Sequence, residues 1–253
     1  MTTSLHTLIQ TLDDWMQADS FQDYAPNGLQ VEGRDAIHKL ALGVTASADV
    51  IEQAVGWGAD ALLVHHGYFW KNESATLTGI KGRRIRALLE NQMSLIAYHL
   101  PLDCHPEFGN NKTLLDQLDL PDGSPIDGEG GLLWSVALDG QLSLDQLADR
   151  IASRLDRTPT VIRSPQAKDR LERMIVCTGG AQDYITKAQR YGADIYLSGE
   201  ISERTTHEAR ELGVHYIAAG HHATERYGVQ ALGSKISQTM GLETAFFDDH
   251  NPA

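Results

Sequence analysis

Two apolar stretches of this 253-residue chain end in paired histidines. One stretch leads directly into His65-His66, and the other leads through a glycine into His221-His222, with Glu225 three residues further on. Apolar runs of this length are typical of buried strands. In α/β proteins the carboxyl ends of strands are rigid, and ligands bind beside them. Imidazole and carboxylate groups at such ends predict a catalytic metal site.

A third apolar stretch, 95–98, runs into His99 and, four residues later, Asp103. We expect the metal ligands to come from these three strand ends. The predicted ligands are His65, His66, Asp103, His221 and Glu225. Neutral imidazoles with carboxylates suit Zn, Mn, Fe, Co or Ni, and they are a poor set for Ca or Cu(I). Five donors, none of them a thiolate, are more than one tetrahedral structural site uses. They suit two adjacent metals that share a bridging carboxylate or water and keep open positions, which indicates catalysis.

Each of these histidines also has a plainer interpretation. A single histidine at a strand end is more often solvated or hydrogen-bonded than a ligand, and adjacent histidines on a strand face opposite sides unless a turn brings them together. The same residue classes at several strand ends nevertheless favour metal binding. His222 and His215 are weaker candidates, since His221 already has the spacing from its carboxylate that His99 has from Asp103.

Other residues are candidates for catalysis or substrate binding. We expect His99 or Glu200 to carry protons or to support a ligand, and His207 is either a further residue of this kind or part of a helix surface. Arg83 and Arg84 lie in a basic stretch of an otherwise acidic chain. They either bind a substrate phosphate or belong to a solvated helix face.

The chain contains an internal duplication. The triplet Gly-Ala-Asp occurs at 58–60 and at 192–194, which is 134 positions later (192 minus 58), and the same offset relates His66 to Glu200. Each copy reads as a strand, a turn, a helix and a second strand, which indicates a βαβ unit with parallel strands. In both copies a third strand follows, and after it a histidine and a carboxylate separated by three residues.

We therefore predict an α/β fold of two pseudo-twofold-related lobes, with mixed, largely parallel sheets and a metal cleft between them. The expected boundaries are 1–125 for the first lobe, 126–170 for a short β-α-β connecting segment and 171–253 for the second lobe. Residues 121–131 are rich in Gly, Pro and Asp and are expected to form a loop. Ser143, followed by Gln three residues later, predicts the capped start of a helix.

Composition narrows the functional classes. The chain carries 34 acidic and 21 basic residues, a net charge of −13, which argues against a broad surface for nucleic-acid polymers. Cys104 and Cys177 do not form a disulfide framework; the second reads as a core residue, and the first is either that or a thiol near the site. No signal peptide and no membrane-length apolar window are evident, so we expect a cytoplasmic protein.

Seven motifs of the chain carry a family resemblance. They are Asn27–Gln30, Gly43–Thr45, Val64–Gly67, His99–Asp103, Gly109–Asn111, Ser198–Glu200 and Gly220–Glu225. In this order they resemble the motifs of the NGG-interacting-factor-like family, whose members are also called GTP cyclohydrolase 1 type 2 homologues. The longer phrases Asp23–Gly33 and Ala219–Arg226 are similar to the bacterial YbgI branch. The resemblance covers nearly the whole chain.

The resemblance implies a dinuclear metal centre with two divalent ions per chain. The ligands of the family carry over onto His65, His66, Asp103, His221 and Glu225, the same residues that the spacing indicates. It also implies a toroidal homohexamer in which the metal sites face an internal cavity. The name GTP cyclohydrolase 1 type 2 homologue associates the family with GTP cyclohydrolase activity.

We expect a metal-dependent hydrolase of a small phosphorylated or nucleotide-like substrate, in the manner of a cyclohydrolase, amidohydrolase or phosphoesterase. Water activated by two metals would attack carbon or phosphorus. His99 or Glu200 would move the proton, and Arg83 and Arg84 would bind the anionic end. The alternative is a non-enzymatic, hexameric metal-binding scaffold or regulatory adaptor. We expect neither a nucleic-acid polymer nor a membrane as partner.

Overall fold

The computed structural model describes residues 1–140 and 142–253, which fold into two compact α/β units. The first unit comprises Met1–Phe108 and Val229–His250, and the second comprises Gly109–Gly228 and Asn251–Ala253. Each unit has one large sheet with both parallel and antiparallel strand pairs. The predicted α/β class with two lobes is therefore confirmed.

The first unit is built on a five-stranded sheet in the order β13-β4-β5-β6-β2. All neighbouring pairs are parallel except β6 and β2, and β1 pairs with β3 in a separate two-stranded sheet. The elements of this unit are β1 (Thr3–Ser4), α1 (Leu5–Met16), the 3-10 helix η1 (Ala18–Ser20), β2 (Gly28–Val31), β3 (Ala36–Ile37), β4 (Lys39–Thr45), α2 (Ala48–Trp57), β5 (Ala61–His66), α3 (Gly79–Glu90), β6 (Ser94–Ala97), α4 (Leu100–Cys104), most of α10 (Arg226–Met240) and β13 (Glu243–Phe246).

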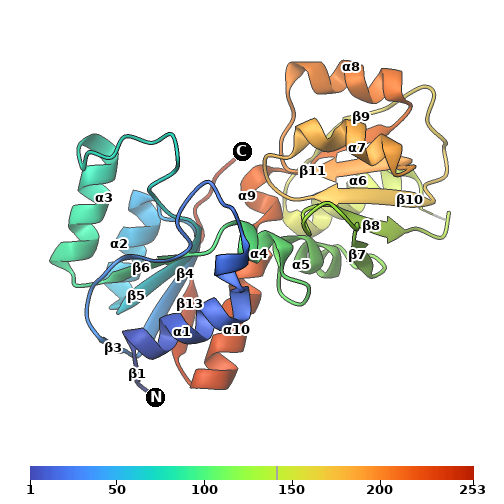
Figure 1. Cartoon of the computed structure of the whole chain (residues 1–253). Helices are drawn as coiled ribbons and strands as arrows, with labels where there is room; N and C mark the ends of the chain where they lie inside the picture. The colour runs from blue at the N-terminus through green and yellow to red at the C-terminus, as the bar shows by residue number, and fades with distance from the viewer. Residues whose placement is uncertain (141) are drawn as a thin grey trace. The chain divides into compact units, whose positions relative to one another are not determined.

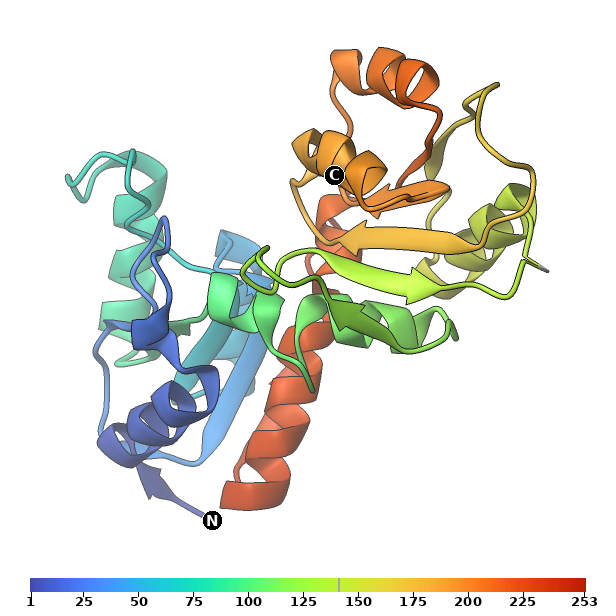
Figure 2. The ribbon, with the colours of Figure 1, turned by 45° about the vertical axis from the view of Figure 1, so that its right-hand side comes forward.

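Helices cover both faces of this sheet, as Figures 1 and 2 show. Alternate residues of each strand point to opposite faces, so a strand buried on both faces is apolar along its whole length. In β5, Leu63 packs with α1 and α10, whereas its neighbours Leu62 and Val64 pack with α2 and α3. This three-layer packing holds the carboxyl ends of β4, β5 and β6 in a fixed row.

The second unit repeats this plan around a six-stranded sheet in the order β7-β8-β10-β11-β12-β9. The three central strands are parallel, and the outer ones are antiparallel to their neighbours. The elements of this unit are α5 (Asn110–Gln117), β7 (Gly123–Pro125), β8 (Trp134–Ala137), α6 (Leu144–Leu155), β9 (Thr160–Ile162), β10 (Arg173–Cys177), the 3-10 helix η2 (Gln182–Tyr184), α7 (Ile185–Arg190), β11 (Ile195–Ser198), α8 (Glu203–Leu212), β12 (His215–Ala218) and α9 (His221–Thr224). Helices α5 and α6 pack on one face, and α7 and α8 on the other.

The unit boundaries differ from those expected at 1–125, 126–170 and 171–253. Strand β13 pairs in parallel with β4, which places the C-terminal strand in the sheet of the first unit. The expected connecting segment does contain β8, α6 and β9, but both strands extend the second sheet, beside β10 and β12. These boundaries are set by pairing between strands that are far apart in the sequence. Local composition does not encode such pairing. A short strand, β7, also lies in the stretch expected to be a loop.

The duplicated order of elements is present in both units. The first has β4, α2, β5, α3, β6 and α4, and the second has β10, α7, β11, α8, β12 and α9. In each, Gly58 or Gly192 adopts a positive φ at the end of the first helix, where a left-handed residue ends the helix and glycine has no steric penalty. The short helix that follows the third strand carries the histidine and carboxylate motif.

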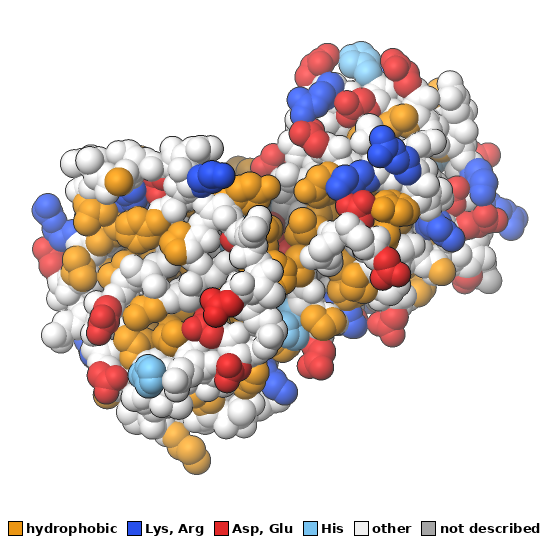
Figure 3. Space-filling view, viewed as in Figure 1, with side chains coloured by type: hydrophobic (Ala, Val, Ile, Leu, Met, Phe, Trp, Pro, Cys, Tyr) orange, Lys and Arg blue, Asp and Glu red, His pale blue; other side chains and the backbone are white. Residues whose placement is uncertain are grey.

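The visible surface in Figure 3 carries acidic and basic side chains side by side, with no broad basic area on that face. This agrees with the acidic composition of the chain. None of the helices in the described part of the chain combines the length and apolar character that crossing a bilayer requires.

Candidate metal centre

His65 and His66 are the last two residues of β5. The Nδ1 atom of His65 lies 3.0 Å from the carbonyl oxygen of Tyr98, and Nδ1 of His66 lies 3.1 Å from Oγ1 of Thr45, its partner in the pairing of β4 with β5. The two rings are only 4.4 Å apart between centroids, although both residues belong to the strand. They meet because the sheet ends here, and side chains from its two faces can approach beyond its edge.

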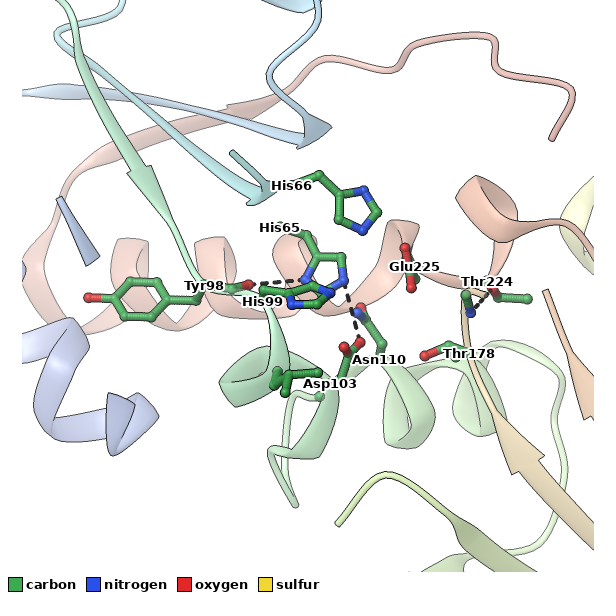
Figure 4. A network of polar contacts seen from close by, with 12 residues as sticks. His65, His66, Tyr98, His99, Asp103, Asn110, Thr178, Thr224 and Glu225 are labelled. Atoms are coloured by element: carbon green, nitrogen blue, oxygen red, sulfur yellow. Dashed lines mark hydrogen bonds and ion pairs between the residues drawn. The ribbon is translucent and has the colours of Figure 1, made fainter. Parts of the chain in front are cut away.

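Helix α4 brings Asp103 to the first of these histidines. It starts after His99, with a proline in its first turn, and the backbone amide of Asp103 donates to the carbonyl of His99 at 3.1 Å. One helical turn therefore separates His99 from Asp103. The Oδ1 atom of Asp103 lies 3.4 Å from Nε2 of His65, whose side chain is fully buried. Figure 4 shows His65 between Tyr98 and Asp103.

A second carboxylate holds His99. Its Nδ1 atom lies 2.7 Å from Oδ1 of Asp23, which is 3% exposed, and its backbone amide donates to Oδ1 of Asn27 at 2.8 Å. Asn27 therefore fastens the 25–30 segment to the site in addition to forming part of a turn. One potential ligand atom from each of His65, His66 and His99 lies within 4.8 Å of the others. The first unit thus groups three imidazoles and two carboxylates, those of Asp103 and Asp23.

The second unit groups one imidazole with two carboxylates. His221 opens α9, and its Nε2 atom lies 3.1 Å from Oε2 of Glu225, four residues later. Its Nδ1 atom lies 2.7 Å from Oε1 of Glu200, which follows β11. The side chain of Glu225 is 4% exposed, whereas that of Glu200 is 43% exposed. The structure therefore brings together all three residues that the sequence selects in this half.

Glycines make room for these side chains. A Cβ atom on Gly179 would lie 2.0 Å from Oε1 of Glu225, and one on Gly199 would lie 2.7 Å from the backbone Cα of His221. Gly179 also has a φ of +69°, a conformation that favours glycine. Its carbonyl accepts hydrogen bonds from the amides of Gly199 and Glu200, and its amide donates to Oγ1 of Thr224.

The charges of the paired groups are mutually stabilising. Burial acts to lower the pKa of His221, but Glu225 and Glu200 outweigh it and raise this pKa to about 9. Burial acts to raise the pKa of Asp23, but the hydrogen bonds and charge of His99, with further hydrogen bonds from Asn27 and the Leu100 amide, lower it to about 2. Both carboxylate and imidazole pairs are therefore strong interactions in partly buried surroundings.

The hydrogen bonds at Nδ1 suit these imidazoles to metal binding. A carbonyl or carboxylate oxygen can only accept, so His65, His99 and His221 carry a proton on Nδ1, and in the neutral ring the lone pair is on Nε2. Metal-binding histidines almost always have their other nitrogen held in this way by a carboxylate, carbonyl or water. His215 differs, because its Nδ1 accepts from the amide of Ser164 and its Nε2 donates to the carbonyl of Lys168. The donor set therefore fits divalent metal ions.

Other predicted residues lie elsewhere in the two units. Arg83 and Arg84 line a cavity of about 430 Å³ between α2 and α3, together with apolar residues such as Ile51. His207 is exposed on α8 and contacts Glu203 one turn away, which fits the plainer interpretation of a helix surface. Burial raises the pKa of Cys104 to about 12, with Asp103 and Asp23 adding to the effect, so this thiol is not poised to ionise.

Sequence reasoning gave no role to Asp23, Thr45 or Gly179. Asp23 lies in the stretch that carries the family resemblance, and its contact with His99 spans 76 positions of the chain. Thr45 ends β4 and Gly179 follows β10, so both stand at equivalent strand ends of the duplicated units. The duplication was the signal by which Gly179 and Thr45 could have been found.

Comparisons with known proteins agree on a single family. The model of the Duf34/NIF3 (NGG1p interacting factor 3) family matches residues 3–252. A "GTP cyclohydrolase 1 type 2 homolog" of Allochromatium vinosum is 52% identical over 251 residues, covering 99% of this chain and 98% of the relative. A "GTP cyclohydrolase 1 type 2 homolog" of Vibrio cholerae is 50% identical over 246 residues, covering 95% and 96%.

A solved structure described as protein ybgI, of unknown function, superimposes with a TM-score of 0.94 at 42% identity, covering 99% of this chain and 100% of that one. The crystal structure of a Thermus thermophilus protein gives a TM-score of 0.90 at 32% identity, covering 99% and 100%. The family model, the curated relatives and the solved structures thus all match nearly the entire chain. The chain belongs to the Duf34/NIF3 family.

Proposed function

We propose that this protein is a dinuclear metal-dependent hydrolase of a small phosphorylated or nucleotide-like molecule in the cytoplasm. The observation that carries the proposal is the set of imidazoles at strand ends whose Nδ1 atoms are held by oxygen atoms. Two buried carboxylates lie beside them, Asp103 at 3.4 Å from Nε2 of His65 and Glu225 at 3.1 Å from Nε2 of His221. The names of the relatives, which refer to GTP cyclohydrolase, favour a nucleotide-like substrate.

In this proposal the two donor sets together hold two divalent ions, chosen from Zn, Mn, Fe, Co and Ni. The ligands are those predicted from the sequence: His65, His66, Asp103, His221 and Glu225. The ions would supply Lewis acidity and lower the pKa of a water molecule toward neutrality. The buried state of His65, Asp103 and Glu225 supports this assignment, because buried donors are held in a fixed geometry.

The remaining residues have supporting roles. We assign proton transfer to Glu200, because its side chain is 43% exposed while one oxygen is held by His221. We assign Arg83 and Arg84 to the anionic end of the substrate, as the sequence predicts. They line a cavity with apolar walls that none of the predicted metal ligands lines, so this role requires a substrate that reaches from that cavity to the metal ions. Replacing both arginines by alanine is expected to raise KM and to leave the metal content unchanged.

The decisive experiment is a screen of nucleotides, phosphoesters and cyclic amides with added Mn, Zn, Fe or Ni. Once a substrate is found, His65→Ala and Glu225→Ala are expected to lower kcat by about 10³-fold, since two-metal catalysis supplies several kcal/mol. His207→Ala, on the exposed face of α8, is the matched control and should retain full activity. Undiminished turnover after the metal is stripped would contradict the proposal, and fully closed coordination by protein atoms would favour a scaffold.

We further propose the homohexameric ring that the family resemblance implies. Light scattering coupled to size-exclusion chromatography should give a mass near six times that of the chain. A monomer at micromolar concentration would contradict this part and leave the proposed chemistry untouched.

A further inference from the structure

We propose that His99 is a sixth metal donor and that Asp23 is the residue that positions it. This inference rests on the proposed function and extends its ligand set. The Nδ1 atom of His99 lies 2.7 Å from Oδ1 of Asp23. Since a carboxylate accepts hydrogen bonds, Nδ1 carries the proton and Nε2 carries the lone pair that a metal needs.

Asp23 is itself rigidly held. Its side chain is 3% exposed, and its Oδ2 atom accepts hydrogen bonds from the backbone amide of Leu100 at 2.8 Å and from the amide group of Asn27 at 3.0 Å. Its Oδ1 atom also accepts from the amide of Tyr24 at 2.6 Å. A carboxylate fixed by three donors besides His99 leaves the ring little freedom to turn, which is the arrangement of carboxylate, histidine and metal seen in metalloproteins.

His99 also lies beside two predicted ligands of the same unit. Its ring centroid is 5.1 Å from that of His65 and 5.8 Å from that of His66, and the potential ligand atoms of the three residues lie within 4.8 Å of one another. Figure 4 shows the three rings grouped at the ends of β5 and β6. Trp70 packs edge-on against His99 with centroids 4.9 Å apart, which further fixes the plane of the ring.

The duplication provides an independent argument. His99 stands after the third strand of its unit and four residues before Asp103, as His221 stands four residues before Glu225 in the other unit. The Nδ1 atoms of both histidines lie 2.7 Å from a carboxylate oxygen, supplied by Asp23 in one unit and by Glu200 in the other. His221 is a predicted ligand, and His99 shares both its spacing from a carboxylate and the contact of its Nδ1 atom with a carboxylate oxygen.

The test combines diffraction with zinc titration of the full-length protein. In crystals of the zinc-loaded protein, anomalous density at the zinc edge is expected about 2.1 Å from Nε2 of His99. In solution, competition with a chromophoric chelator should show that Asp23→Asn and His99→Gln weaken zinc binding about 10- to 100-fold, the usual effect of losing such support. Asp19→Asn and His207→Gln, both at exposed positions, are the matched controls and should bind zinc normally.

The possible outcomes separate this inference from the proposed function. Zinc bonded to His65 and His66 but not to His99 would overturn the inference and leave the proposed metal centre standing. Zinc affinity in Asp23→Asn equal to that of the unmodified protein would also overturn it, provided that thermal unfolding shows a folded variant. A protein that takes up no zinc, manganese, iron, cobalt or nickel would overturn both. The diffraction experiment needs no variant, so it decides the matter even if a substitution prevents folding.

Discussion

The partner of each ring nitrogen distinguishes the histidines of this protein. Those expected to bind metal donate through Nδ1 to an oxygen atom, as His65 does to Tyr98 and His221 does to Glu200. His215 has the opposite tautomer, because the amide of Ser164 donates to its Nδ1. Both ring nitrogens of His215, which begins β12, are thus occupied by hydrogen bonds to the backbone. This histidine is therefore structural.

At the residue scale, His215 gives a prediction about pH. Burial holds the pKa of His215 below its usual value, so the unfolded chain binds a proton at a higher pH than the folded one. The stability that the neutral ring contributes is complete above about pH 6.5 and is lost as the pH falls below that value. In His215→Ala, the free energy of unfolding should decline less between pH 7.5 and 5.5 than in the unmodified protein.

At pH 7.5 the same variant should be less stable by about 1–3 kcal/mol, because the buried amide of Ser164 and the partly buried carbonyl of Lys168 lose their partner. Urea unfolding at each pH measures both effects. His207→Ala is the control, since this side chain is exposed, and should change neither the stability nor its pH dependence. An unchanged slope in His215→Ala would show that this ring does not titrate as its burial indicates.

At the scale of elements, the turns that follow the strands determine the geometry of the site as much as its side chains do. Gly199 follows β11, and a Cβ atom there would lie 2.6 Å from the carbonyl oxygen of Gly179 and 2.7 Å from the Cα of His221. Both are backbone atoms, so they cannot rotate away. The close approach of these loops is what sets Glu200 against His221.

Gly199→Ala is therefore expected to destabilise the second unit by about 1–3 kcal/mol through overpacking. Gly56→Ala is the matched comparison, because Gly56 lies in α2 with nothing within 4 Å of a new Cβ atom. That change should stabilise the protein by about 0.5–1 kcal/mol, since alanine favours the helix. Urea denaturation measures the free energy of unfolding of both variants. A change in the same direction for both would contradict the crowding at Gly199.

The start of α6 offers a second test at this scale. Ser143 caps the helix by accepting from the amide of Gln146, whose side chain accepts from the amide of Ser143 in return. Ser143→Ala should lower the free energy of unfolding by about 1 kcal/mol. Ser153→Ala, at an exposed position within the same helix, should be neutral or slightly stabilising. Similar losses at both positions would point to the helix as a whole and not to its cap.

At the scale of the whole molecule, metal binding should be visible as stability. An ion that binds the folded state alone adds about 2.7 kcal/mol when its concentration is 100 times Kd. For a chain of this length we expect a rise in Tm of about 5–10 °C with zinc, measured by calorimetry. Because predicted ligands occur in both units, His65→Ala and Glu225→Ala should each reduce this rise, whereas His207→Ala should keep it. Equal Tm values with and without zinc would contradict a folded-state metal centre.

The sequence by itself determined the α/β class and the duplication, and it picked out histidines and carboxylates that each unit brings together. Strand and helix patterns are local, and the fixed spacing of His99 from Asp103 and of His221 from Glu225 survives folding because one helical turn spans it. Only the tertiary structure decided that β13 completes the first sheet and that Asp23 holds His99 across 76 positions. Such contacts depend on loop closure and side-chain packing between distant segments, and no local pattern records which distant groups will meet.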